Sequence, residues 1–232
     1  MKAFNRGLYD LLLHSRDRAY RADELLAALA RAGLGLGGLG TQFSLAQGRA
    51  LAWARKRQGR DPDTTTLAIH AAAAYDGPVY LSFTRDPVPK IFTPDYPFEI
   101  GKAVTVRDGK DVVIIAMRDL TAHALVAAEQ LAAKGIDARV IDCPTLKPLD
   151  TETILAAARE TGAVVTAENN VIFGGLGSAV AELLVENLPL PMQRIGVQDT
   201  FAESGPYLDL LDKYGLSAPH IAAATEAVLK RK

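Results

Sequence analysis

Between residues 103 and 197 the chain alternates β-prone runs with helical runs, and this alternation constrains the fold more than any other feature. The expected strands are Ala103–Val106, Val112–Ala116, Ala138–Asp142, Ala163–Ala167 and Met192–Val197. The helical patterns between them are Thr121–Lys134, Asp150–Thr161 and Leu176–Asn187. Strands joined through whole helices need crossover connections, which make neighbouring strands parallel. We therefore predict an α/β fold, a three-layer sandwich with a mostly parallel sheet.

One pair of strands is expected to depart from this arrangement. Ala103–Val106 and Val112–Ala116 flank Asp108-Gly109, and Asp-Gly is a strong turn signal. We predict that the two runs form a hairpin whose first strand lies antiparallel at an edge of the sheet. Two more helices are expected after the last strand, at Tyr207–Tyr214 and Ala218–Lys230.

The first 60 residues differ from the rest in charge and pattern. They hold 11 Lys and Arg against 4 Asp and Glu, so they carry +7 and the remaining residues −8. Residues 1–32 and 44–58 have helical patterns, and Gly35, Gly37 and Gly40 match G-x-G-x-x-G. A dinucleotide site needs that motif after a strand, whereas here it follows a helical pattern. We interpret residues 1–60 as a helical segment with a glycine linker, whose basic charge is a solvated face or, alternatively, a nucleic-acid contact.

Residues 61–98 have yet another pattern. Asp61-Pro62-Asp63-Thr64 is a typical helix start, and the helix is expected to run to Tyr75. Val79–Phe83 is a short predicted strand, and the proline-rich stretch Pro87–Pro97 is a predicted extended linker.

Candidate functional residues follow the predicted strands. Glu168 and Asn169 come after one strand, and Gly174, Gly175 and Gly177 then open a helix. Such a loop presents free N–H groups that can hold an anion, or its glycines allow close packing or subunit contact. The single cysteine, Cys143, and four scattered histidines predict no metal site, and no nucleophile motif predicts a catalytic residue.

Three phrases carry a family resemblance: Glu99–Ala103, Val140–Asp150 and Val165–Ala179. In amino-acid sequence and in order these segments resemble the C-terminal section of transketolases. The resemblance extends from about Asp61 to the end of the sequence. The resemblance implies three parts: residues 1–60, which do not match; residues 61–98, a remnant of a pyrimidine-binding domain and linker; and residues 99–232, a transketolase C-terminal domain.

The resemblance also implies what the chain has and lacks. It places a substrate-phosphate contact at Arg85, directly after the predicted strand Val79–Phe83. The family uses thiamine diphosphate and Mg²⁺, and a glutamate of the pyrimidine-binding domain activates the cofactor. No counterpart of that glutamate precedes residue 61, so we expect the chain alone to be inactive and not to bind the cofactor.

Two hypotheses remain open. The chain is the C-terminal section of an enzyme of the pentose phosphate pathway that moves two-carbon ketol units between sugar phosphates, working with an N-terminal subunit, as a homodimer, or both. Alternatively, it is a non-catalytic dimerisation module derived from that domain.

No apolar run approaches the length of a membrane span, and we expect a cytoplasmic protein with no nucleic-acid partner. If residues 61–90 belong to a larger domain, they should expose apolar side chains unless other residues cover them.

Overall fold

A computed structural model describes residues 43–45, 64–82, 88–92, 96 and 98–232. The predicted helices before residue 43 and the glycine linker lie outside these residues. A small sheet precedes the main domain: β1 (Phe43–Leu45) pairs antiparallel with β2 (Val79–Leu81). Helix α3 (Thr64–Ala74) lies between them in sequence, as predicted from its proline start. The predicted helix 44–58 was wrong at its first two residues, which are in β1.

The main domain has one five-stranded sheet with the order β3-β5-β4-β6-β7. Its strands are β3 (Val104–Arg107), β4 (Val112–Ala116), β5 (Ala138–Asp142), β6 (Val164–Val171) and β7 (Met192–Val197). Only the pair β3 and β5 is antiparallel, and the pairs β4–β5, β4–β6 and β6–β7 are parallel. This confirms the mostly parallel sheet with one antiparallel edge strand.

The predicted hairpin was wrong, because β3 pairs with β5 and not with β4. The turn at Asp108-Gly109 passes against the start of β5, where Lys110 and Asp111 both donate their N–H groups to the Asp137 carbonyl. A Cβ atom at Gly109 would lie 2.3 Å from the Ala138 carbonyl carbon. The absence of a Cβ atom at Gly109 therefore lets two backbones pass close to each other. The connection from β3 to β4 crosses the start of β5 and does not form a hairpin.

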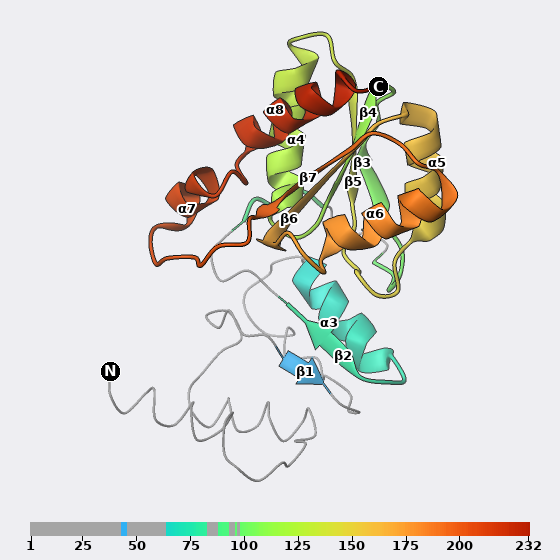
Figure 1. Cartoon of the computed structure of the whole chain (residues 1–232). Coiled ribbons are helices and arrows are strands. Elements are labelled where there is room, and N and C mark those ends of the chain that lie inside the picture. The colour runs from blue at the N-terminus through green and yellow to red at the C-terminus, as the bar shows by residue number, and fades with distance from the viewer. Residues whose placement is uncertain (1–42, 46–63, 83–87, 93–95, 97) are drawn as a thin grey trace.

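Helices cover both faces of the sheet (Figure 1). One face carries α4 (Leu120–Ala132) and α8 (Ala218–Leu229), with α7 (Tyr207–Lys213) beside them. The other carries α5 (Thr151–Thr161) and α6 (Leu176–Asn187). Successive side chains of β4 point to opposite faces of the sheet. Val112 and Ile114 pack against α4 and α8, whereas Val113 and Ile115 pack against α5 and α6. All of β4 is buried, as expected of a central parallel strand.

The predicted ends of α5 are confirmed in detail. The side chain of Asp150 accepts a hydrogen bond from the Thr153 N–H at 3.1 Å, and Gly162 closes the helix with a left-handed φ of 67°. Asp150 also accepts from the Ala103 N–H at 2.9 Å, so the same carboxylate fixes the chain entering β3.

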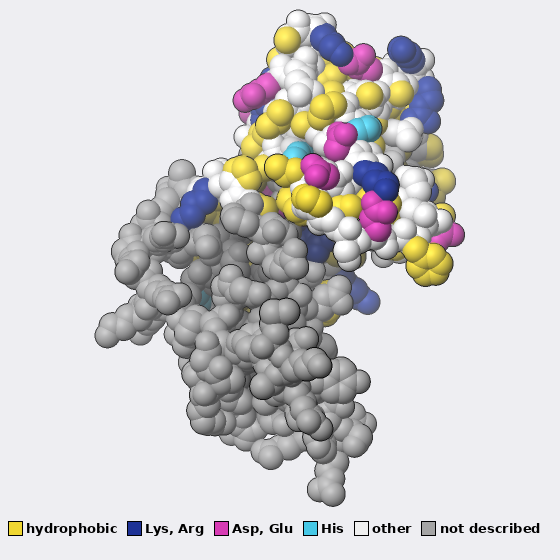
Figure 2. Space-filling view, turned by 90° about the vertical axis from the view of Figure 1, so that its left-hand side faces the viewer, with side chains coloured by type: hydrophobic (Ala, Val, Ile, Leu, Met, Phe, Trp, Pro, Cys, Tyr) yellow, Lys and Arg dark blue, Asp and Glu magenta, His cyan; other side chains and the backbone are white. Residues whose placement is uncertain are grey.

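The space-filling view of the side with α7 shows hydrophobic, acidic and basic side chains interspersed over the described surface (Figure 2). None of the described helices is both long and apolar enough to cross a membrane.

Candidate functional site

The sheet order reverses between β4 and β6, and this point defines the candidate site. From β4 the chain leaves through α4 toward β5 on one side, and from β6 it leaves through α6 toward β7 on the other. In open α/β sheets the crevice at the carboxyl ends of two such strands is the usual ligand position. The residues found there are Arg118 and Asp119 after β4, and Glu168 and Asn169 near the end of β6.

Arg118 joins three segments at this point. Its Nη1 donates to Ser82 Oγ at 2.6 Å, and its Nη2 donates to the Asn169 carbonyl at 2.7 Å. The carbonyl of Asn169 lies in the irregular part of β6, where the pairing with β7 shifts register between Ala167 and Val171. The interrupted ladder leaves this carbonyl for the guanidinium. Arg118 therefore connects the segment after β2 to the carboxyl end of the main sheet.

Asp119 continues the same network. Its carboxylate is buried, and Oδ2 accepts from Asn169 Nδ2 at 3.0 Å and from the Tyr207 hydroxyl. Oδ1 of Asp119 and Nε of Arg118 are buried without a hydrogen-bond partner among the described atoms. Buried polar atoms without partners are rare in folded proteins, and two of the three such side-chain atoms among the described residues belong to this network.

Unlike Asp119, Glu168 has hydrogen-bond partners for both of its carboxylate oxygens. Glu168 is 1% exposed, and its two carboxylate oxygens accept from the N–H groups of Leu176 at 2.9 Å and Gly177 at 2.8 Å. These N–H groups belong to the first turn of α6, where a negative charge is favourable. The carboxylate of Glu168 thus takes the position that an external anion would need.

The glycines of this loop have distinct packing roles. A Cβ atom at Gly175 would lie 1.9 Å from Glu168 Oε2, and one at Gly177 would lie 2.9 Å from Arg194 Cδ. Gly174 has a left-handed φ of 72° and open space around it. The geometry favours close packing as the role of Gly175 and Gly177, and a subunit contact at the loop stays a prediction.

A third buried carboxylate lies at the end of β5. Asp142 is 4% exposed and accepts from Thr121 Oγ1, in the first turn of α4, at 2.6 Å. Burial raises the pKa of Asp142 to about 6, although the hydrogen bond from Thr121 lowers it. Burial, with the nearby negative charge of Asp142, also raises the pKa of Cys143 to about 12 and that of Tyr96 well above its ordinary value. The thiol of Cys143 is therefore protonated at neutral pH.

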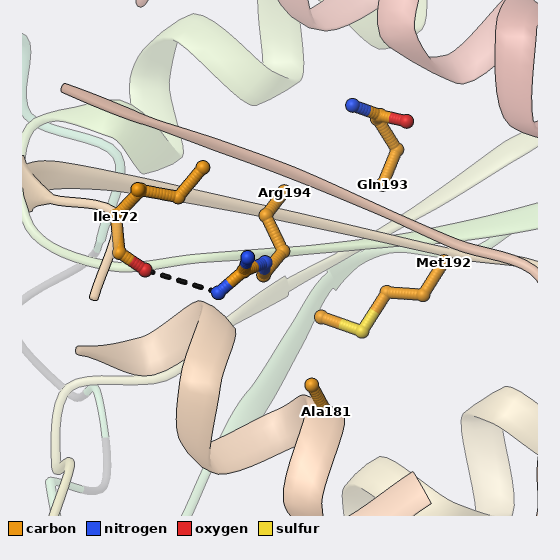
Figure 3. A pocket seen from close by; sticks show the side chains of 5 residues that line it. All are labelled: Ile172, Ala181, Met192, Gln193 and Arg194. Atoms are coloured by element: carbon orange, nitrogen blue, oxygen red, sulfur yellow. Dashed lines mark hydrogen bonds between the residues drawn. The ribbon is translucent and has the colours of Figure 1, made fainter. Parts of the chain in front are cut away.

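A depression of about 290 Å³ lies between α6 and β7. It is lined by Ile172, Ala181, Met192, Gln193 and Arg194. Arg194 donates to the Ile172 carbonyl at 3.1 Å (Figure 3), so its guanidinium is already engaged. The depression presents no carboxylate, cysteine or histidine from its lining, and we assign it no chemistry.

The described residues do not fit the cofactor of the resembled family. They contain no cluster of three or more His, Cys, Asp and Glu that could ligate Mg²⁺. The helix start at α6, the predicted anion position, holds the Glu168 carboxylate. We therefore derive no step through thiamine diphosphate or magnesium from these residues.

One predicted site residue, Arg85, is not described by the structure, and three residues of the site were not predicted. The network that sequence reasoning missed centres on Arg118, Asp119 and Tyr207. The only sequence signal was that Arg118 and Asp119 follow a predicted strand, and the sequence does not state the strand order that puts them at the reversal.

The family model for the C-terminal domain of transketolase matches residues 101–221. This chain belongs to the transketolase family. The match covers the five strands of the main sheet and the loop with Glu168 and Gly175. The family, which includes 1-deoxy-D-xylulose-5-phosphate synthases, depends on thiamine diphosphate.

Similar proteins include subunits of divided enzymes. The chain is 48% identical over 159 residues to the 6-deoxy-6-sulfo-D-fructose transketolase subunit SqwH of a Clostridium species, covering 68% of this chain and 49% of that protein. It is 38% identical over 171 residues to a putative transketolase C-terminal section of Methanocaldococcus jannaschii, covering 72% and 53%. A solved structure described as a split gene transketolase, inactive beta4 tetramer, has a TM-score of 0.70 at 49% identity, covering 72% of this chain and 55% of that one.

The chain spans about half the length of these relatives. A 1-deoxy-D-xylulose-5-phosphate synthase of Symbiobacterium thermophilum aligns over 98% of this chain at 33% identity, covering 36% of that protein. That alignment extends into residues 1–60, whereas the three above cover 68% to 72% of the chain.

Proposed function

We propose that this chain supplies the C-terminal section of a thiamine-diphosphate-dependent enzyme that transfers two-carbon ketol units between sugar phosphates. The observation that carries the proposal is the family match over residues 101–221, together with 48% identity to a transketolase subunit. The partner is an N-terminal subunit that holds the diphosphate and magnesium. We place the protein in the cytoplasm and the reaction in the pentose phosphate pathway.

The chain alone is proposed to be inactive. Residues 1–60 offer no counterpart of the activating glutamate, and the described residues offer neither a magnesium cluster nor a free anion position at α6. In this proposal Arg85 contacts the substrate phosphate, because a guanidinium can bind phosphate oxygens through paired N–H donors. The parts are residues 61–98, from a pyrimidine-binding domain, and residues 99–232, the C-terminal domain.

Exposed aromatic side chains in the first part support a partner. Tyr75 is 49% exposed and Tyr80 is 56% exposed. Tyr75 directly follows α3 and Tyr80 lies in β2, so both are in the segment expected to show apolar faces if it belongs to a larger domain. A partner subunit that completes the domain would cover them.

Calorimetric titration with thiamine diphosphate and Mg²⁺ tests the proposal, with and without an N-terminal transketolase subunit. We expect no measurable binding by the chain alone, and binding with turnover of ketose phosphates in the assembled complex. Tight binding by the lone chain would contradict the predicted dependence on a partner.

The second candidate is a non-catalytic oligomerisation module. It is favoured by the 49% identity to a chain whose solved structure is described as an inactive beta4 tetramer. Sedimentation with and without the N-terminal subunit separates the two candidates, since the module self-associates and gains no turnover when the subunit is added.

A further inference from the structure

Arg118 has a backbone conformation that its residue type rarely adopts. Its φ is 56°, and it is the one non-glycine residue with positive φ among those the structure describes. A residue with a Cβ atom is strained in the left-handed region, and such strain persists where the surroundings hold it in place. Arginine at this position therefore needs an explanation in its side chain.

The side chain bridges two parts of the molecule. Its two terminal nitrogens reach Ser82 Oγ at 2.6 Å and the Asn169 carbonyl at 2.7 Å, on segments separated from Arg118 by 36 and 51 residues. The planar fork of a guanidinium can donate in two fixed directions at once, which an ammonium group does less well. The left-handed turn after β4 aims the fork into the gap between these two segments.

Neither of these two hydrogen bonds of the guanidinium is part of an ion pair. Among the residues that the structure describes, no carboxylate lies within ion-pair distance of Arg118, and both acceptors are neutral oxygens. Next to it, Asp119 and Asn169 are held by each other and by the Tyr207 hydroxyl. The Asn169 end of the bridge is therefore fixed by the main domain, and Ser82 is the end that the bridge holds.

We propose that Arg118 is a positioning residue that fixes the chain leaving β2 against the carboxyl end of the main sheet. Ser82 precedes Arg85 by three residues in the sequence. The consequence for substrate rests on the proposed function, in which Arg85 contacts the substrate phosphate. In that function Arg118 acts through Ser82 and makes no contact with the substrate itself.

Hydrogen exchange on the full chain tests the bridge without any partner. R118G removes the guanidinium and also relieves the strained φ, so the main domain stays folded. We expect amides of α3 and β2 to exchange about tenfold faster, as for loss of one charge-assisted hydrogen bond, while β4 and β6 keep their rates. S82A removes the Ser82 acceptor and leaves Arg118 unchanged, so it should accelerate the same amides. Unchanged α3 and β2 rates in both variants would overturn the proposal, as would equal acceleration throughout the chain in S82A.

Kinetics of the complex with an N-terminal transketolase subunit test the consequence. R118G should raise KM for a ketose phosphate several-fold with kcat retained, and it should leave KM for the unphosphorylated ketose unchanged. R118K should restore part of the affinity, because it keeps one of the two contacts. An equal effect on both substrates, or a fall in kcat alone, would overturn the positioning of the phosphate contact. If the wild-type complex has no turnover, the proposed function fails, and the exchange rates still decide whether Arg118 holds Ser82.

Discussion

Helices α4 and α6 both begin at the carboxyl edge of the sheet, and their first turns are built differently. At α6 the buried Glu168 places one carboxylate oxygen on each of two backbone N–H groups, at 2.9 and 2.8 Å. At α4 the preceding Asp119 makes no capping hydrogen bond, and one of its buried oxygens has no partner among the described atoms. Arg118, before it, has a strained φ of 56°.

The α6 turn stabilises the main domain itself, whereas the α4 turn connects the domain to other segments. A buried charge is stable only when its hydrogen bonds are complete, so the α6 turn has one arrangement and resists change. The α4 turn uses its polar groups to reach outward, to Ser82, Asn169 and Tyr207, and leaves local groups unsatisfied. We expect substitutions at the α6 turn to affect the stability of the domain, and those at Arg118 to affect the attachment of β2.

The largest effect is expected for G175A at the α6 turn. The added Cβ would lie 1.9 Å from Glu168 Oε2, so the carboxylate must leave its two N–H partners while still buried. We expect a loss of about 3 kcal/mol or more in the free energy of unfolding, measured by urea denaturation.

G174A is the matched control for that substitution. Gly174 has open space around it and a φ of 72°, so alanine there meets only backbone strain of about 1 to 2 kcal/mol. Equal losses in G174A and G175A would mean that the fit around Glu168 does not govern the α6 turn.

The next effect concerns Asp142, which lies under the α4 turn. Its pKa is raised to about 6 in the folded chain from an unfolded value of 3.8. The folded state therefore binds the proton more tightly, and stability falls as pH rises from about 4 to about 6. D142N should remove this dependence, so the variant gains up to about 3 kcal/mol relative to wild type between pH 4 and pH 7.

Urea denaturation at several pH values measures this difference. D108N is the matched control, because the side chain of Asp108 is 93% exposed and its titration should change little on folding. A difference between D142N and wild type that is the same at pH 4 and pH 7 would contradict a raised pKa for Asp142.

E168Q tests whether the charge at the α6 turn matters beyond its shape. Glutamine keeps the volume but turns one acceptor into an NH₂ donor that faces a backbone N–H. We expect a loss of about 2 kcal/mol in the free energy of unfolding, smaller than that of G175A. No loss would show that α6 does not depend on a negative charge at its start.

R118G should have the smallest effect on overall stability. Relief of the positive φ contributes about 1 to 2 kcal/mol, and the main domain loses only the hydrogen bond to the Asn169 carbonyl, at a cost of about 1.5 kcal/mol. We expect a net change below about 1 kcal/mol by urea denaturation, in contrast to G175A. A loss as large as that of G175A would erase the distinction between the two turns.

Much of the fold was predictable because the decisive interactions are local. The strand and helix pattern of the main domain, the Asp150 cap and the Gly162 end depend on neighbours within one or two turns, and these were confirmed. The hairpin prediction failed because Gly109 looks like a turn residue in sequence, whereas its lack of a Cβ serves a close crossing over Ala138. A single glycine has the same sequence signal in both uses.

The candidate site was predictable only in part, for a related reason. The sequence marked Glu168 and the glycines as a strand-to-helix loop, but it left open whether the loop binds an anion or packs closely. Only the folded chain shows that the carboxylate of Glu168 itself takes the N–H groups of α6. Asp142 became notable only through its burial, which raises its pKa.

By itself, the sequence determined the fold class, the family resemblance and the ends of most helices, because periodicity and caps are properties of adjacent residues. The tertiary structure decided the strand order β3-β5-β4-β6-β7 and the contacts of Arg118 with Ser82 and Asn169. These residues lie 36 and 51 positions apart from Arg118, and no local pattern encodes a contact between distant segments. The parallel pairing of β4 with β6 brings Arg118 and Asn169 together, and the packing of the segment after β2 against this edge adds Ser82.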